Sequence, residues 1–123
     1  KSLKTNKINM LTDGNEERDF LFIDDCCAGL EKIMIKYNHI NKKDIIDMSF
    51  GKFSKIIKIA QIIKKILLKK NIYVEILKNK KKDNVQRNTK NIPNKRINKY
   101  WNPKINLEEG IDKLISFYMS QKK

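Results

Sequence analysis

The strongest pattern of apolar and polar positions lies in residues 55–70. Apolar side chains recur there at every third or fourth position, and lysines fill the opposite face. This spacing predicts a helix with one buried face and one solvated lysine face. Ser54 stands immediately before the helix, so we expect its hydroxyl to cap the free amides of the first turn. The apolar face consists of Ile56, Ile59, Ala60, Ile63, Ile66 and Leu67.

A second helix is predicted over residues 25–37, where apolar side chains also repeat at helical spacing. Asp24 and Asp25 stand at its start. They are expected to be caps or first-turn acids, because the helix dipole favours negative charge there. The apolar positions of this segment are Cys26, Cys27, Leu30, Ile33, Met34 and Tyr37.

A third predicted helix closes the chain. Asn106 is a good N-cap residue, and Glu109 follows at the spacing of a capping box. Gly110 interrupts the apolar stripe of this helix. Glycine costs roughly 1 kcal/mol relative to alanine inside a helix, so we expect another group to pack closely against Gly110. Trp101 is expected to pack the closing helix onto the core.

Three apolar runs have the length and composition of strands: residues 20–23, 45–48 and 72–77. A shorter apolar patch at residues 8–11 is a further candidate, and turns are expected at 13–15 and 49–52. Residues 78–104 are polar and irregular, with ten basic residues against one acidic residue, and disorder is the alternative for this segment. This order of strands and helices predicts an α/β or α+β fold.

The formal net charge of +14 raises the question of nucleic-acid binding. Of the 28 basic residues, 25 are lysines and three are arginines, and asparagine and isoleucine are also abundant. A genome rich in A and T would give this composition whatever the function. The basic half, residues 48–123, has few aromatic residues to stack bases and little arginine to recognise guanine. We therefore expect a solvated lysine-rich surface and no nucleic-acid partner.

Neither metal binding nor membrane insertion is expected. Cys26 and Cys27 are adjacent, and neighbouring residues rarely form a disulfide because its geometry needs converging Cβ atoms. With His39 as the single histidine, a zinc site lacks ligands, and both cysteines are expected to be small core residues of a reduced protein. The chain has no apolar run of membrane-spanning length and no signal peptide, so we expect a cytoplasmic protein. It begins with Lys1, which indicates processing or a fragment.

Several separated segments, taken together, resemble one enzyme family. Residues 18–25 read Arg-Asp-Phe-Leu-Phe-Ile-Asp-Asp and follow Asp-Gly at 13–14. Residues 45–54 contain a glycine turn and end in serine. Residues 83–87 read Asp-Asn-Val-Gln-Arg, and residues 101–110 read Trp-Asn-Pro-Lys-Ile-Asn-Leu-Glu-Glu-Gly. In this order and spacing, these segments resemble the nucleotide-sugar epimerases and dehydratases, which are extended short-chain dehydrogenase/reductases.

The resemblance implies that residues 1–123 are the C-terminal substrate-binding region of a Rossmann-type enzyme, without its N-terminal dinucleotide-binding half. The parent enzyme would use NAD or NADP, and this chain alone would bind neither. Its four glycines are too far apart for the Gly-rich phosphate-binding turn.

No catalytic residue is expected in this chain. The family's catalytic tyrosine and lysine lie one helical turn apart, and two pairs here have that spacing. Tyr100 and Lys104 flank Pro103, which argues against a continuous helix. Tyr118 and Lys122 stand at the end of the chain, long past the place of the catalytic pair.

Three residues are implied by the resemblance to bind substrate. Arg18 and Arg87 occupy positions where the family places arginines against the diphosphate, and a planar guanidinium suits phosphate oxygens better than an ammonium does. Asn91 stands where the family's aspartate contacts the nucleotide ribose. The alternative for Arg18 is an ion pair with Glu16, Glu17 or Asp19, and the alternative for Arg87 is a solvated loop charge.

The sequence therefore predicts the nucleotide-sugar-binding part of an NAD(P)-dependent epimerase, dehydratase or reductase, with a homodimeric parent. The segment at Asp83 and Arg87 leans toward enzymes resembling GDP-fucose synthase. One alternative is a stand-alone basic module that binds nucleic acid, and another is a non-catalytic relative. If the other half is missing, we expect exposed apolar surface and aggregation of the isolated chain.

Overall fold

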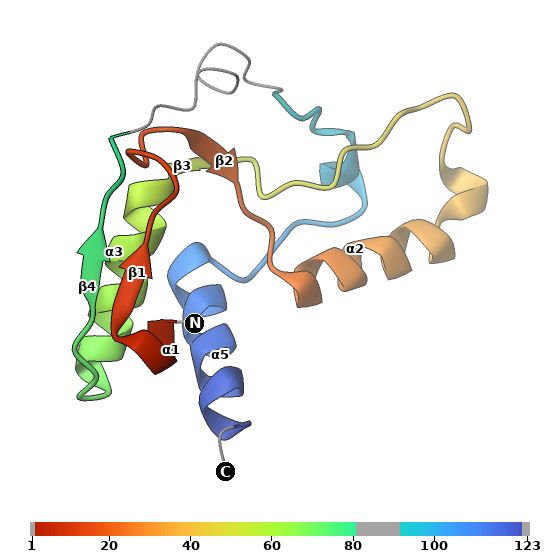
Figure 1. The fold of residues 1–123 in the computed structure, drawn as a ribbon. Coiled ribbons are helices and arrows are strands. Elements are labelled where there is room, and N and C mark those ends of the chain that lie inside the picture. The colour runs from red at the N-terminus through yellow and green to blue at the C-terminus, as the bar shows by residue number, and fades with distance from the viewer. Residues whose placement is uncertain (1, 81–91, 122–123) are drawn as a thin grey trace.

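The computed structural model describes residues 2–80 and 92–121, which form a mixed arrangement of helices and short strands (Figure 1). The α/β class predicted from the sequence is confirmed. In chain order the elements are α1 (Ser2–Thr5), β1 (Lys7–Asn9), β2 (Glu17–Asp19), α2 (Ile23–Ile35), the 3₁₀ helix η1 (Tyr37–His39), β3 (Phe53–Lys55), α3 (Ile56–Lys69), β4 (Glu75–Leu77), the 3₁₀ helix η2 (Arg96–Lys99) and α5 (Leu107–Ser120).

The strands form two separate pairs. β1 and β4 are parallel, with Ile8 opposite Ile76, and β2 and β3 are antiparallel, with Arg18 opposite Ser54. The turn expected at residues 13–15 lies between β1 and β2, and its Gly14 has a φ of +77°. That left-handed conformation favours glycine because it has no Cβ.

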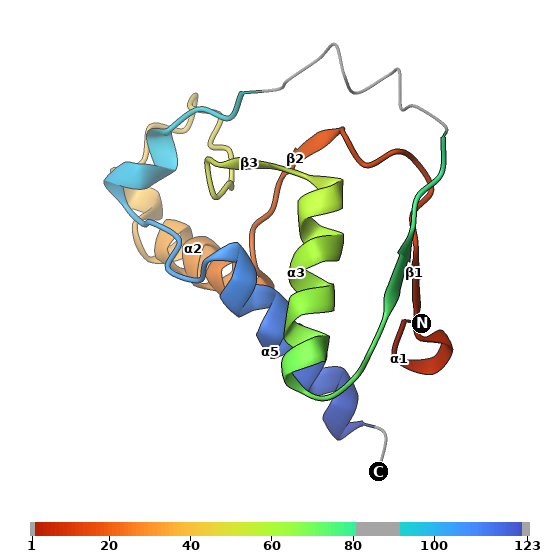
Figure 2. The ribbon, with the colours of Figure 1, turned by 90° about the vertical axis from the view of Figure 1, so that its left-hand side faces the viewer.

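The core lies between α3, α5 and the β1–β4 pair. Figure 2 shows α3 and α5 side by side, with β1 and β4 on the other flank of α3. Leu67 of α3 is fully buried there. The buried residues of this cluster are Ile66, Leu67, Val74, Ile111 and Ile115. The apolar stripes predicted for residues 55–70 and for the closing helix, which form α3 and α5, are the surfaces that meet.

The start of α5 agrees with the sequence prediction. The Asn106 side-chain oxygen accepts a hydrogen bond from the Glu109 amide at 3.0 Å, so Asn106 is the N-cap. Gly110 is buried, and a Cβ added there would lie 2.9 Å from Cδ2 of Phe22. The close packing expected at Gly110 is therefore confirmed, and the ring that packs there comes from the residue just before α2.

Two predicted strands are wrong. Residues 20–22 have no strand pairing and Ile23 already begins α2. Pairing of β2 ends at Asp19, whose carboxylate instead accepts a hydrogen bond from the Gly51 amide at 2.9 Å. Residues 45–48 are also outside any strand, and Ile45 is 75% exposed. The long-range hydrogen bonds of this segment are made by a side chain and not by a strand ladder: the Asp47 carboxylate accepts from Asn94.

The predicted cap of α3 is also wrong. Ser54 lies within β3, and the N-cap position belongs to Lys55, whose side chain makes no capping hydrogen bond. The first amides of α3 donate to backbone carbonyls instead: Ile56 to Glu16 at 3.0 Å and Ile57 to Gly14 at 2.9 Å. These two bonds do what a capping hydroxyl would have done.

The helix predicted over residues 25–37 forms as α2, with Asp24 and Asp25 in its first turn as expected. Cys26 is half-buried, whereas Cys27 is exposed, so the expectation that both are core residues is wrong for Cys27. Both are free thiols. Within the described residues, no helix is long and apolar enough to cross a membrane.

Candidate functional site

The β2–β3 ribbon brings two of the family-like segments together. Arg18 and Ser54 are direct partners in this antiparallel pair, so their side chains leave the ribbon on the same face. The hydrogen bond from the Gly51 amide to the Asp19 carboxylate holds the turn that precedes β3. Gly51 has a φ of +76° in this turn. Segments 32 residues apart in sequence thus form one local unit.

Arg18 lies half-buried in the middle of β2. Its Nη1 donates to the Glu17 carbonyl oxygen at 2.9 Å. It lines a hollow between β1 and α3 whose walls include Ile8 and Ile59. Its role in ligand binding stays a prediction, because this geometry fits both a ligand contact and a structural one.

The other two predicted site residues, Arg87 and Asn91, lie outside the described residues. The chain just beyond them is tied to the second family-like segment. The Asn94 amide and its Nδ2 both donate to the Asp47 carboxylate at 2.8 Å, and Nδ2 also donates to the Ile45 carbonyl at 3.1 Å. Asp47 is therefore a positioning residue that sequence reasoning missed, since nothing in the sequence distinguishes it from other acidic residues.

The last family-like segment, residues 101–110, is called the closing segment here. The buried carboxylate of Asp25 holds it against α2. One Asp25 oxygen accepts hydrogen bonds from the amides of Lys104 and Ile105, at 3.0 and 2.7 Å. Trp101 is buried nearby, and a Cβ on Gly29 would lie 3.1 Å from its ring. Trp101 is therefore buried as expected, and its ring lies against α2. An acidic residue at the buried edge of an amphipathic helix was the signal that could have identified Asp25.

The expectation that Tyr100 and Lys104 do not lie on one continuous helix is confirmed. Tyr100 ends η2, and the residues from Trp101 to Asn106 are not helical, so Tyr100 and Lys104 do not share a helical turn. Tyr118 lies on α5, while Lys122 is outside the described residues.

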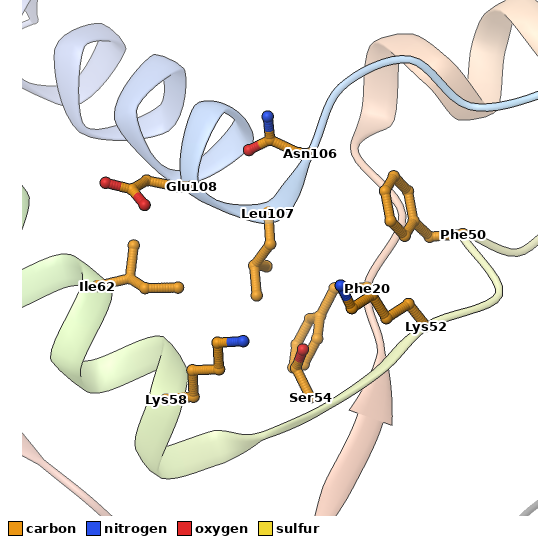
Figure 3. A pocket seen from close by; sticks show the side chains of 9 residues that line it. All are labelled: Phe20, Phe50, Lys52, Ser54, Lys58, Ile62, Asn106, Leu107 and Glu108. Atoms are coloured by element: carbon orange, nitrogen blue, oxygen red, sulfur yellow. The ribbon is translucent and has the colours of Figure 1, made fainter.

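A polar pocket lies beside the ribbon, where the beginnings of α3 and α5 meet (Figure 3). Its volume is about 240 Å³. Phe20 and Leu107 form part of its apolar wall, while Lys52, Ser54 and Lys58 bring polar atoms to it. In residues 2–80 and 92–121, no group of three or more His, Cys, Asp or Glu residues is placed to hold a metal ion.

Comparison with known proteins gives matches among solved structures alone: no protein-family model and no curated protein matches the chain. The structure of RMD from Pseudomonas aeruginosa complexed with NADPH is 17% identical with a TM-score of 0.74, covering 98% of this chain and 38% of that chain. MlghC, the GDP-mannoheptose C4 reductase from Campylobacter jejuni with NADP bound, is 20% identical with a TM-score of 0.71, covering 92% and 35%. UDP-glucose 4-epimerase with UDP-glucose from Thermotoga maritima is 18% identical with a TM-score of 0.74, covering 95% and 36%.

These likenesses establish the fold. Nearly all of this chain shares its mixed α/β fold with a portion of each of these larger proteins. The chain spans little more than a third of the length of the structures it matches.

Proposed function

We propose that this chain is the nucleotide-sugar-binding part of an NAD(P)-dependent epimerase, dehydratase or reductase. The observation that carries the proposal is the structural likeness over more than nine-tenths of the chain to enzymes of this kind. The pairing of the Arg18 segment with the Gly51 turn supports it, because two segments of the sequence resemblance form one unit in space.

The proposed role of this part is to hold and orient the substrate. Arg18 and Arg87 would contact the diphosphate, where a guanidinium can donate two parallel hydrogen bonds to phosphate oxygens. Asn91 would hydrogen-bond the ribose hydroxyls through its amide. The likeness to GDP-fucose synthase, the homodimeric parent and the cytoplasmic location stay predictions.

The described residues do not fit a dinucleotide site. That site needs a glycine-rich turn between a strand and a helix, so that the pyrophosphate can approach the helix N-terminus. Here β3 runs directly into α3, with Ser54 and Lys55 at the junction and no glycine between them. NAD or NADP, which supplies the hydride chemistry in such enzymes, would have to be held by another part of the protein.

The test is a calorimetric titration of the protein with a UDP-sugar and a GDP-sugar, comparing Arg18→Ala and Arg87→Ala with the original chain. The remaining arginine, Arg96, gives a matched control, because it pairs with Asp44 at 3.1 Å on the surface. Loss of a charged hydrogen bond costs about 1.5–3 kcal/mol, so each Arg→Ala change at the site should raise Kd by roughly 10- to 100-fold. Arg96→Ala should change Kd less than about twofold.

Equal binding by the original chain, Arg18→Ala and Arg87→Ala would refute the site. Absence of nucleotide-sugar binding, together with DNA or RNA binding that weakens steeply with salt, would favour the basic-module alternative. The coding sequence upstream of Lys1 gives a second test. An open frame with a Gly-rich strand–helix turn and a Tyr-x-x-x-Lys pair would establish the larger enzyme, and an in-frame stop would favour a genuine short protein.

A further inference from the structure

The pocket in Figure 3 is a separate site from the hollow that Arg18 lines. Four of its residues are apolar and five are polar. The polar residues come from three elements: the turn before β3, the β3–α3 junction and the start of α5. The lining consists of Phe20, Phe50, Lys52, Ser54, Lys58, Ile62, Asn106, Leu107 and Glu108.

The fold explains why these polar groups meet. Ser54 leaves β3 on one face of the ribbon, and α3 begins two residues later, so Lys58 on its first turn lies over the same space. Figure 3 shows the Ser54 hydroxyl and the Lys58 ammonium pointing into the space beside Leu107, with Lys52 approaching from the opposite side.

The Ser54 hydroxyl is the observation that points to a ligand. Ser54 is only 8% exposed, and among the described residues no hydrogen bond to its hydroxyl is formed. The residue as a whole is buried, and its side chain lines the pocket, so a molecule that enters the pocket can reach the hydroxyl. The capping role that the sequence predicted for this hydroxyl is filled by the carbonyls of Gly14 and Glu16. Ser54 therefore presents an unused donor to the pocket.

The charge around the pocket is positive. The N-terminus of α5 faces it, where the helix dipole favours an anion. Glu108 is the one acidic residue of the lining, and its carboxylate accepts a hydrogen bond from Lys65 at 2.9 Å. That bond and the charge of Lys65 lower the pKa of Glu108, so the carboxylate stays ionised and compensated. Lys52 and Lys58 have no such carboxylate among the lining residues.

We propose that this pocket binds the phosphate group of a small phosphorylated molecule. Ser54 would donate a hydrogen bond to a phosphate oxygen, Lys52 and Lys58 would supply the opposing charge, and the rings of Phe20 and Phe50 would contact the organic part. The volume of about 240 Å³ lies below the range of roughly 300–1,000 Å³ of pockets for drug-sized molecules, so the ligand must be smaller than those. This site does not depend on the proposed function, since it shares no residue with Arg18, Arg87 and Asn91.

The test is a ¹⁵N NMR titration of the whole chain with inorganic phosphate and with glycerol phosphate, at constant ionic strength. We expect saturable shifts centred on the amides of Ser54, Leu107 and Glu108. Ser54→Ala and Lys58→Met should each weaken binding by roughly 3- to 10-fold, the loss of one hydrogen bond or one surface charge. Lys64→Met is the matched control, because Lys64 lies on the same helix outside the pocket lining and is exposed.

Two results would overturn the proposal. One is the absence of saturable shifts at these amides, and the other is equal weakening by Lys64→Met and Lys58→Met, which would show general charge attraction. Lys58 is exposed, so its variant should fold even if Ser54→Ala does not. Arg18→Ala should keep its phosphate affinity here while losing nucleotide-sugar binding, which separates this site from the proposed function.

Discussion

Helices α2 and α3 have nearly the same length, 13 and 14 residues, and both carry apolar side chains at helical spacing. Their surroundings differ. α3 is covered by α5 on one flank and by the β1–β4 pair on the other, and Leu67 is fully buried (Figure 2). α2 extends away from that core, and Met34 and Ile35 near its end are 77% and 63% exposed (Figure 1).

The difference shows that an apolar stripe is buried only where another element reaches it. α2 is held near its first turns, where Asp25 binds the closing segment and Gly29 lies against Trp101. Beyond Gly29, no described element covers its apolar positions to the extent seen for α3. The apolar side chains near the end of α2 therefore remain exposed to solvent.

The largest effect on stability is expected in the core around α3. Leu67→Ala should lower the free energy of unfolding by about 2–5 kcal/mol, because it leaves a cavity among well-packed neighbours. Leu30→Ala is the matched control on α2, where the side chain is 49% exposed, and its cost should stay below about 1 kcal/mol. Urea denaturation followed by Trp101 fluorescence measures both. Equal losses for the two leucines would show that α2 is as well covered as α3.

A smaller effect is expected where α2 is tied to the closing segment. Asp25→Ala leaves the Lys104 and Ile105 amides without their acceptor, which should cost about 1–3 kcal/mol. Asp24→Ala removes a first-turn acid of the same helix that is exposed, and it should cost less than about 1 kcal/mol. Hydrogen exchange of the Lys104 and Ile105 amides should become faster in the Asp25 variant alone. Unchanged exchange would mean that Asp25 does not hold this segment.

The contact between Phe22 and Gly110 joins the start of α2 to α5. In Gly110→Ala the new Cβ would come within 2.9 Å of the Phe22 ring, so overpacking of about 1–3 kcal/mol outweighs the gain in helix propensity of about 1 kcal/mol. We expect a net loss of roughly 1 kcal/mol in urea denaturation. Adding Phe22→Leu should reverse the effect of the Gly110 change, and a purely additive pair would contradict this contact.

The smallest effect concerns pH and the surface between α3 and α5. The hydrogen bond and charge of Lys65 lower the pKa of Glu108 in the folded chain. A lowered folded-state pKa gives stability that is present above the unfolded-state pKa of about 4.3 and is lost as pH falls through the folded-state value. Glu108→Gln should therefore flatten the acid limb of the stability curve slightly, as measured by urea denaturation at a series of pH values. Identical acid limbs for the original chain and for Glu108→Gln would rule out this contribution.

The local sequence determined the three long helices, the Asn106 cap and the turn at Gly14. Each of these depends on residues near one another in the chain, through helical spacing, side-chain capping or glycine conformation. The glycine at 110 indicated a close approach, but only the tertiary structure showed that Phe22 makes it. The same local signals were misleading for residues 20–23 and 45–48. An apolar run there predicted a strand, but a strand also needs a partner at the right register, and that partner is chosen in three dimensions.

The sequence by itself named some residues of the candidate site. The sequence singled out Arg18 on its motif, and it named Arg87 and Asn91 outside the described residues. Only the tertiary structure paired Arg18 with Ser54, moved Ser54 from a capping role to a pocket wall, and gave Asp25 and Asp47 their backbone partners. The reason is physical: periodicity and capping are short-range, whereas which carbonyl, ring or amide meets a side chain from a distant segment is decided when the segments pack.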